Sequence, residues 1–394
     1  MSYRKMKLEE IGKIVSGATP KTSTQDNFGG DIAWITPADL SGYTKKYISH
    51  GKRNITEMGY NSCSTQLMPK GSVLFSSRAP IGYVAIAENP LCTNQGFKSI
   101  VPNDLIDSEF LYYQLKYLSK SIQDKGTGTT FKEISAKTLG KIEIVVPLLS
   151  EQKNIVSRIE ELFSKLDKGV ETLQTIKQQL AVYRQAVLTE AFEGIENTVE
   201  LGSIASIVDP HPSHRTPVEV IGGVPYIGVG DIDYVHHVID FSSSRKVSND
   251  ILQDHLSRYT LHDGDFIMGK IGTIGKPFII ALPQNYTLSA NVILIQPNKK
   301  VVIPKYLFWQ VSSSQITKQL LEGSTSTTQP AFGIKKARLL SIKICSLEEQ
   351  NRIVQKIESH LSLCDDIGQS VTAALSQAEA MRQSILKQAF EGKL

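Results

Sequence analysis

The segment Ser150-Glu151-Gln152-Lys153-Asn154-Ile155-Val156 is repeated 198 residues later as Glu348-Glu349-Gln350-Asn351-Arg352-Ile353-Val354. Two further pairs of segments recur at the same interval, and they are Arg184-Gln185 with Arg382-Gln383, and Ala191-Phe192-Glu193-Gly194 with Ala389-Phe390-Glu391-Gly392. Because the interval stays constant across more than 40 residues, no insertion separates these segments. A continuous helix has no loops that could absorb insertions, so we predict one long helix in each copy of an internal repeat.

The segments that precede the two predicted helices repeat more loosely. Ile11–Val15 resembles Leu201–Ala205 at an offset of 190, and Lys70–Phe75 resembles Asp263–Met268 at an offset of 193. A shared scaffold with loops of unequal length accounts for this drift. The sequence therefore predicts a plan of module, helix, module and helix, with boundaries at residues 1–149, 150–196, 197–346 and 347–394. We call 1–149 the first module and 197–346 the second module.

Apolar residues repeat every seven places in both predicted helices, which is the spacing of a coiled coil. The main series, expected to pair the helices, is Ile159, Leu166, Leu173, Leu180 and Val187 in the first helix and Ile357, Cys364, Val371, Ala378 and Ile385 in the second. A second apolar series is expected at Leu162, Ile176 and Tyr183 and at Ile367, Ala374 and Met381. Ser150 marks the predicted start of the first helix and Gly194 its end.

A helix of this length extends roughly 66 Å at 1.5 Å per residue, so a compact module cannot cover its whole apolar stripe. We expect the two helices to pair with each other as an antiparallel coiled coil, with an approximate two-fold axis relating the two halves. The alternatives are that each helix packs only on its own module, or that the helices drive dimerisation of the chain.

Both modules mix strand-like and helical segments, which indicates an α/β (α+β) fold with an irregular, mostly antiparallel sheet. The predicted strands are 73–75, 83–86, 97–101 and 142–147 in the first module and 266–268, 278–280, 292–295 and 342–345 in the second. The predicted helices are 108–123 and 304–321.

Composition places limits on the class of protein. The chain has 394 residues, and this length exceeds what one hydrophobic core usually supports. Hydrophobic residues make up 41% of the chain. The sequence contains no apolar run long enough for a membrane helix and no signal-peptide core near its first residue, so we expect a cytoplasmic protein. The four cysteines lie far apart without a CxxC pair, and we expect reduced thiols.

Charge is mildly basic and unevenly distributed. The formal net charge is +4, and Lys and Arg exceed Asp and Glu by 18 to 13 in residues 1–150 and by 14 to 11 in 199–345. Acidic residues are in excess in 151–198 and 346–394, by 8 to 6 and by 7 to 5. This distribution favours phosphate contacts by the modules rather than by the helices.

Several apparent motifs do not support catalysis or metal binding. Gly269–Lys276 resembles a phosphate-binding loop, but Pro277 stands where a Ser or Thr is required, and a turn between paired strands is the favoured interpretation. His211, His214 and Asp209 suggest a metal site that has no counterpart in the first module, so solvated loop histidines or base contacts are favoured. We find no nucleophile elbow and predict no catalytic residues, no metal and no cofactor on this chain.

Long polar side chains on a folded scaffold are what DNA recognition requires. The candidates lie near predicted turns or Gly/Thr/Ser-rich segments, and they are Arg78, Asn94, Gln95, Lys98 and Lys132 in the first module and Arg245, Lys246, Lys270, Asn291 and Lys335 in the second.

The duplicated segments at the start and end of the predicted helices, together with Pro147–Gln152 and Leu347–Gln350, resemble the specificity subunits of type I restriction-modification systems. The resemblance covers the whole chain. It is weakest in the second module, where Ala290-Asn291-Val292 aligns with Gln95-Gly96-Phe97.

The resemblance implies a non-catalytic DNA-recognition subunit with two target recognition domains. Each domain would read one half of a bipartite, double-stranded target, while the helices set the spacer and dock two modification (methyltransferase) subunits. S-adenosylmethionine and ATP would then belong to the modification subunits and to the restriction (translocase/nuclease) subunits. The sequence leaves open an adaptor whose modules bind proteins, and an enzyme that modifies or cuts DNA without partners.

Overall fold

The computed structural model describes residues 4–128, 132–213, 215–234, 236–271, 274–323 and 332–394. The chain forms two compact units. The first comprises Met1–Leu173 with Ala373–Leu394, and the second comprises Gln174–Thr372. Each unit therefore contains one module and one segment of each long helix. Within the described residues, no helix combines the length and apolar character needed to cross a membrane.

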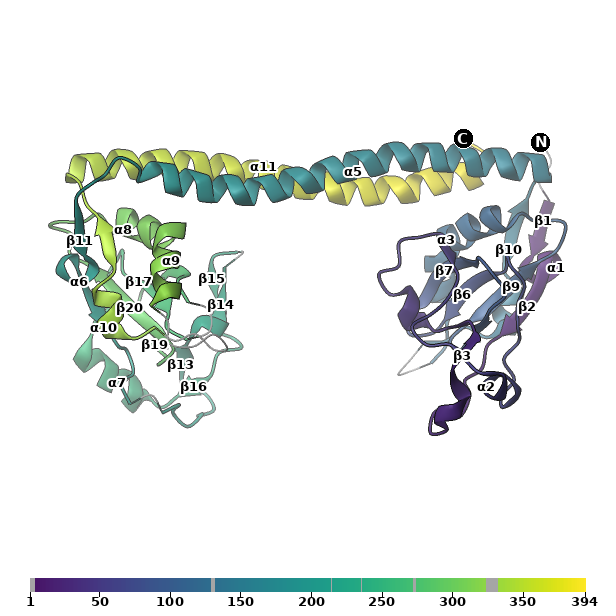
Figure 1. The fold of residues 1–394 in the computed structure, drawn as a ribbon, viewed down its shortest axis with the longest axis horizontal. Helices are drawn as coiled ribbons and strands as arrows, with labels where there is room; N and C mark the ends of the chain where they lie inside the picture. The colour runs from purple at the N-terminus through teal and green to yellow at the C-terminus, as the bar shows by residue number, and fades with distance from the viewer. Residues whose placement is uncertain (1–3, 129–131, 214, 235, 272–273, 324–331) are drawn as a thin grey trace. The chain divides into compact units, whose positions relative to one another are not determined.

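The first unit is built on a five-stranded sheet with the order β2-β9-β6-β7-β5, beside the two-stranded sheets β1-β10 and β4-β8 (Figure 1). Its strands are β1 (Arg4–Lys7), β2 (Gly12–Ser16), β3 (Phe28–Ile32), β4 (Trp34–Ile35), β5 (Tyr47–Ile48), β6 (Val73–Ser77), β7 (Ile81–Ala87), β8 (Cys92–Thr93), β9 (Lys98–Pro102) and β10 (Glu143–Val146). Its helices are α1 (Leu8–Ile11), α2 (Glu57–Asn61), α3 (Ser108–Asp124), α4 (Ala136–Gly140) and the 3-10 turns η1 (Gln25–Asn27) and η2 (Pro37–Leu40).

The second unit has a four-stranded sheet with the order β12-β20-β17-β18, a three-stranded sheet β16-β13-β19, and the pairs β11-β21 and β14-β15. Its strands are β11 (Thr198–Glu200), β12 (Ala205–Val208), β13 (Val224–Ile227), β14 (Ile232–Asp233), β15 (Val238–Ile239), β16 (Lys246–Val247), β17 (Phe266–Gly269), β18 (Pro277–Ile279), β19 (Thr287–Leu288), β20 (Val292–Pro297) and β21 (Ser341–Lys343). Its helices are α6 (Leu201–Ile204), α7 (Asn249–Arg258), α8 (Pro304–Val311), α9 (Ser314–Glu322), α10 (Ile334–Arg338) and the 3-10 turn η3 (Val229–Asp231).

The predicted mixed fold is confirmed, and most strand pairs are antiparallel. Parallel pairing joins β4 to β8, β5 to β7 and β13 to β19. The predicted helix 304–321 is wrong in one respect, because it is two helices, α8 and α9. Ser313 begins the second of them, since its hydroxyl accepts a hydrogen bond from the backbone N–H of Ile316.

Backbone hydrogen bonds show which residues of the two modules are equivalent. Leu8 N donates to Ile142 O in the first module, and Leu201 N donates to Leu340 O in the second, both within 3.0 Å. Leu8 is therefore equivalent to Leu201, and the offset at the start of the modules is 193. The predicted offset of 190 is wrong: the Ile-Gly of 11–12 and the Leu-Gly of 201–202 look alike, but Gly12 opens a strand whereas Gly202 lies in a helix.

The two long helices are α5 (Leu149–Ala191) and α11 (Leu347–Phe390). In the first unit, Leu386 and Ala389 near the end of α11 share a buried cluster with Val156 and Ile159 near the start of α5. The two helix segments of this unit lie side by side (Figure 1), and they run antiparallel because the end of one lies near the start of the other.

The same ion pair joins α5 to α11 in both units. Arg382 pairs with Asp167 in the first unit, and Arg184 pairs with Asp365 in the second. Both the arginines and the aspartates are 198 residues apart, so the pairs are equivalent in the repeat. In the first unit, the Arg382 guanidinium carbon also lies 5.1 Å from the centre of the Phe163 ring.

A buried glutamine fastens the start of α5 to the first module. The Gln152 amide donates to the carbonyls of Leu105 and Pro147, each at 2.9 Å, and its Oε1 accepts from Asp107 N at 2.8 Å. Its side chain is fully buried. The sequence repeat marks this residue but does not reveal its structural role.

Gln350 makes the equivalent bonds at the start of α11. Its amide donates to Val301 O at 3.2 Å and to Cys345 O at 2.9 Å, and its Oε1 accepts from Ile303 N at 2.8 Å. The duplicated Glu-Gln sequence therefore marks the junction between each module and the long helix that follows it.

The main heptad series is well shielded from solvent, whereas part of the second series is not. Ile159, Val187, Ile357, Cys364, Val371 and Ala378 are buried, and Leu166, Leu173, Leu180 and Ile385 are half-buried. The second series is wrong at Ile367 and Met381, which are exposed, whereas Tyr183 is partly exposed but contacts α11, with its hydroxyl 2.9 Å from His360 Nδ1. Leu361 and Ala389, each four places after a main-series residue, are buried instead. Heptad spacing alone does not set the rotation of each helix about its axis.

Candidate nucleic-acid interface

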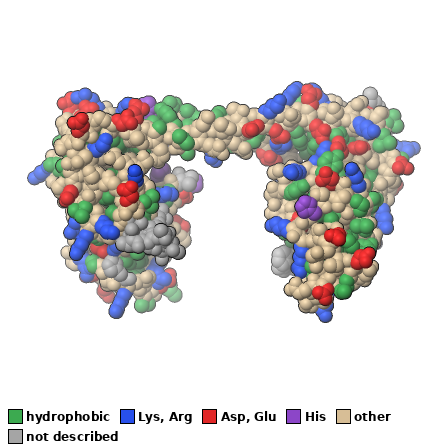
Figure 2. Space-filling view, viewed as in Figure 1, with side chains coloured by type: hydrophobic (Ala, Val, Ile, Leu, Met, Phe, Trp, Pro, Cys, Tyr) green, Lys and Arg blue, Asp and Glu red, His purple; other side chains and the backbone are tan. Residues whose placement is uncertain are grey.

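On the face shown in Figure 2, Lys and Arg side chains in each unit are interspersed with Asp and Glu and form no continuous basic surface. Candidate contacts must therefore be found from local geometry. The equivalent place to examine in both modules is the end of the central strand, β6 or β17, where a turn leads to the next strand. This pairing confirms that Gly269–Lys276 belongs to a segment connecting two paired strands; Gly272–Thr273 lie outside the described residues.

In the first module, two cations share one carboxylate at this place. Arg78 Nη1 lies 3.4 Å from Glu133 Oε2, and Lys98 Nζ lies 3.5 Å from Glu133 Oε1. Lys98 Nζ is also 3.5 Å from the backbone oxygen of Gln95. These distances are at the long end of the hydrogen-bond range, and one positive charge remains uncompensated. The cluster can therefore exchange the carboxylate for an external acceptor.

Asn94 and Gln95 lie in the turn that precedes β9. Asn94 Oδ1 accepts from Gly96 N at 2.9 Å, which holds the turn, and Gln95 is exposed with its Oε1 bound to the Thr19 hydroxyl. Gly96 packs against Pro37, where an added Cβ would come within 2.7 Å of a ring carbon. The close packing fixes the turn that positions Gln95 beside Lys98.

The corresponding place in the second module is electrically neutral. Ser77 N donates to Gly96 O at 2.7 Å, and Lys270 N donates to Asn291 O at 2.8 Å, so Lys270 stands where the first module has Ser77. Lys270 is 9% exposed, and its Nζ lies 2.8 Å from Asp209 Oδ2. Lys270 is thus the least accessible of the candidates for DNA contact.

The remaining candidates are not gathered into one cluster. Arg245 is exposed, with Nη1 at 3.8 Å from Glu219 Oε2, and Lys246 is half-buried next to it at the start of β16. Lys132 is exposed, as is Lys335 on α10. Asn291 is half-buried, and its Oδ1 accepts from the Ser289 hydroxyl.

Sequence reasoning missed a buried histidine pair in the second module. His211 Nε2 lies 2.9 Å from Arg215 O, which can only accept, and His211 Nδ1 lies 3.0 Å from His255 Nε2. His255 Nδ1 accepts from the Thr287 hydroxyl. The His255 ring is then neutral, with its N–H at Nε2.

The histidine pair holds the segment that carries Asp209. His255 is fully buried on α7, and its burial, with His211 alongside, lowers the pKa of His255 to about 4. The prediction of a solvated loop histidine is wrong for His211, which is 7% exposed. His214 lies outside the described residues. Histidine, cysteine and carboxylate side chains form no group of three able to hold a metal ion in the described part of the chain.

The remaining histidines and the cysteines have ordinary environments. His236 and His237 are exposed, and His236 Nδ1 lies 2.6 Å from Asp233 Oδ2. The four cysteines, Cys63, Cys92, Cys345 and Cys364, are free thiols, as expected.

Residues 2–181 and 196–377 match the model of the family described as Type I restriction modification DNA specificity domain. The MjaIX specificity subunit of Methanocaldococcus jannaschii is 46% identical over 179 residues, which cover 44% of this chain and 41% of that protein. The EcoBI specificity subunit of Escherichia coli is 25% identical over 421 residues, covering 100% of this chain and 86% of that protein. The alignment thus spans under half of the first relative and most of the second.

Two solved structures share the fold along the whole chain. One chain, from work on complex assembly and conformational transition of the type I R-M system, gives a TM-score of 0.74 at 17% identity and covers 100% of this chain and 98% of that chain. The HsdS subunit of Thermoanaerobacter tengcongensis gives a TM-score of 0.58, also at 17% identity, and covers 100% and 97%.

Proposed function

The chain belongs to the family of type I restriction-modification specificity subunits, and from this premise we propose that its two modules read the two halves of a bipartite DNA target. One observation carries this proposal. The two modules share a scaffold, but the polar groups stand at different positions on it: Lys98 of the first module corresponds to Ile293 in the second, and Asn291 of the second corresponds to Gly96 in the first. Different donors and acceptors on one scaffold suit two different base sequences.

The chemistry of each side chain assigns it a type of contact. Arg and Lys favour guanine O6 and N7, whereas Asn and Gln favour adenine N6 and N7. In the first module we therefore assign Arg78, Gln95 and Lys98 to base edges, and Lys132 to phosphate. In the second module, we assign Arg245 and Asn291 to base edges, and Lys246 and Lys335 to phosphate. Lys270 would hold Asp209 in place rather than contact DNA.

The paired helices would set the spacing between the two half-sites and dock two modification subunits. The equivalent ion pairs Arg382–Asp167 and Arg184–Asp365 support an antiparallel coiled coil with an approximate two-fold axis. Such an axis would present the modules to DNA in opposite orientations, about one helical turn apart. Deletion of one heptad from both helices should change the spacer length and leave the half-sites unchanged.

We assign no catalytic step to this chain. Methyl transfer from S-adenosylmethionine would take place on the modification subunits, and ATP-driven translocation and cleavage on the restriction subunits. Such a complex would act in the cytoplasm, where it can reach its DNA target. The role of this chain is then to bind, orient and space the DNA.

The test is genome-wide mapping of methylated adenines in cells that express the cognate modification subunit with and without this chain. A split, asymmetric motif that depends on the chain is the expected result. If an active modification subunit produces no motif that depends on the chain, the modules act as protein-binding adaptors and the proposal fails.

A further inference from the structure

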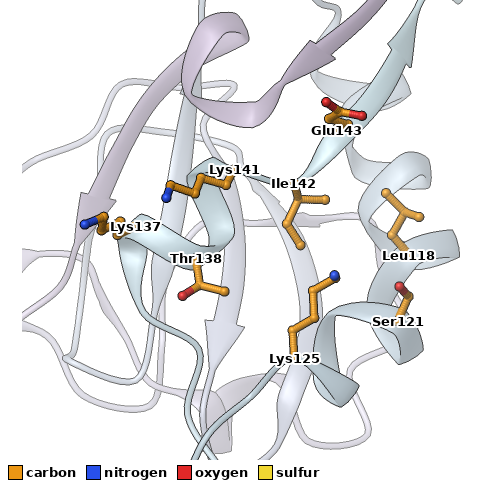
Figure 3. A pocket seen from close by; sticks show the side chains of 8 residues that line it. All are labelled: Leu118, Ser121, Lys125, Lys137, Thr138, Lys141, Ile142 and Glu143. Carbon is orange, nitrogen blue, oxygen red and sulfur yellow. The ribbon is translucent and has the colours of Figure 1, made fainter.

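A basic pocket lies in the first unit between the end of α3, helix α4 and strand β10 (Figure 3). Its volume is about 560 Å³. Lys137, Thr138 and Lys141 line it from α4, and Leu118, Ser121 and Lys125 line it from the end of α3. The floor is apolar, whereas the rim carries hydroxyl and ammonium groups.

The lysines of this pocket are not neutralised by the protein. Among the described residues, Lys125, Lys137 and Lys141 have no ion-pair or hydrogen-bond partner for their ammonium groups, and all three are exposed. Glu143 is the one carboxylate among the lining residues. Three positive charges against one negative charge make this a site for an anion.

In the second unit, a side chain bridges the equivalent helix and strand. Helices α3 and α9 end at Asp124 and Glu322, 198 residues apart, which makes Gln319 the counterpart of Ser121. Gln319 donates to Ser341 O at 3.2 Å and accepts from Ser341 N at 2.9 Å. The side chain of Ser121 is too short to make the same two bonds, and the pocket lies at this place in the first unit.

Two of the three lysine positions also differ between the units. Lys125 is replaced by Gly323, whose carbonyl accepts from Lys336 Nζ at 2.7 Å. Lys141 is replaced by Leu339, which is exposed. The scaffold therefore does not require Lys125 or Lys141, since the second unit forms the same elements without them, whereas Lys137 keeps a lysine counterpart in Lys335 of α10.

A short chain segment connects the pocket with the candidate nucleic-acid interface. Lys125 precedes Gly126, and an added Cβ at Gly126 would lie 3.4 Å from the Cβ of Lys132. Thr127 and Glu133 exchange two backbone hydrogen bonds, of 3.0 and 2.9 Å, so the segment that starts at the pocket returns to the carboxylate held by Arg78 and Lys98.

We propose that Lys125, Lys137 and Lys141 bind the phosphate backbone of DNA that flanks the bases read by the first module. This inference rests on the proposed function. The hydroxyls of Ser121 and Thr138 supply further donors for phosphate oxygens. Phosphate contacts carry no base information, so the pocket adds affinity and leaves the target sequence unchanged. The first module would then hold DNA more strongly than the second.

The test measures DNA binding by the complete complex of this chain with its modification subunits, over a range of salt concentrations. The K125Q/K137Q/K141Q variant should bind target and non-target duplexes on the order of tenfold more weakly, with a salt dependence shallower by about 1 to 2 in log–log slope. The methylated motif should stay the same. The matched control, K45Q/K52Q/K70Q, removes three exposed lysines of the same unit outside the pocket.

A second variant keeps every charge. S121Q introduces the side chain that bridges the equivalent helix and strand in the second unit, and it should also weaken binding to both duplexes. The proposal is overturned if the pocket triple variant and the control triple variant lose the same DNA affinity. It is also overturned if the pocket variant assembles poorly with the modification subunits but binds DNA with unchanged affinity. That result would indicate that the pocket binds an acidic protein segment. If the wild-type complex binds target and non-target duplexes equally well, the proposed function is refuted. Binding of the variants to the non-target duplex still tests the pocket.

Discussion

The ends of the central strands differ most between the two modules, whereas the junctions with the long helices are nearly the same. Around Glu133 the first module keeps a half-buried cluster with an uncompensated positive charge. At the equivalent place the second module buries Lys270 against Asp209. Gln152 and Gln350, in contrast, make matching sets of hydrogen bonds. The residues that join each module to its long helix have stayed alike in the two copies. The residues at the ends of the central strands have diverged.

The largest effect is expected where the modules are alike. Q152A leaves the carbonyls of Leu105 and Pro147 and the N–H of Asp107 without partners at a buried site, and should cost about 4 kcal/mol of unfolding free energy. Q350A should cost a similar amount, because its bonds are equivalent. Urea unfolding of the full chain measures both values, and costs that differ by more than twofold would break the equivalence.

The next effect separates the modules by pH. The folded-state pKa of His255, about 4, lies below the unfolded value of about 6.5, so unfolding takes up a proton between these pH values. The contribution of His255 to the unfolding free energy is therefore fully present above pH 6.5. The unfolding free energy of the second unit should fall by about 3 kcal/mol as the pH drops toward 4.

Unfolding of the second unit, followed by hydrogen exchange at pH 7 and pH 5, measures this dependence. The matched variant H255Q removes the titrating group and should be less stable at pH 7 but less sensitive to pH. An equal pH dependence in H255Q and the wild type would assign the effect to other groups.

A smaller effect is expected at the cluster of the first module. R78A removes a donor suited to a guanine edge and should weaken target binding by about 2 kcal/mol, or roughly 30-fold, while relaxing only the half-site of the first module. K270A should leave the half-site of the second module unchanged if Lys270 only holds Asp209. Methylation mapping of both variants checks this contrast, which fails if R78A leaves the motif intact.

The smallest effect concerns the equivalent ion pairs between α5 and α11. Arg184 and Asp365 are largely solvent-exposed, so R184A should cost less than about 1 kcal/mol. R382A should cost somewhat more, because the Arg382 guanidinium also covers the Phe163 ring. Thermal unfolding of the two variants gives the order, and a larger cost for R184A would contradict it.

The repeat and the long helices could be predicted from the sequence because they depend on spacing within continuous segments. The central strands followed from local apolar runs in the same way. The site could be predicted only as a set of residue types. Lys98 meets Glu133 across 35 residues and Lys270 meets Asp209 across 61, and no local pattern signals such long-range contacts. The buried pair of His211 and His255, 44 residues apart, was missed for the same reason.

The most direct test of the account is a chain in which residues 201–342 are replaced by a copy of residues 8–144, so that both units carry the first module. These segments begin and end at equivalent backbone positions. Adenine methylation mapping with the cognate modification subunit should then show a symmetric target made of two copies of the first half-site, with the spacer set by the unchanged helices. An unchanged asymmetric motif would contradict the claim that each module reads its own half of the DNA target.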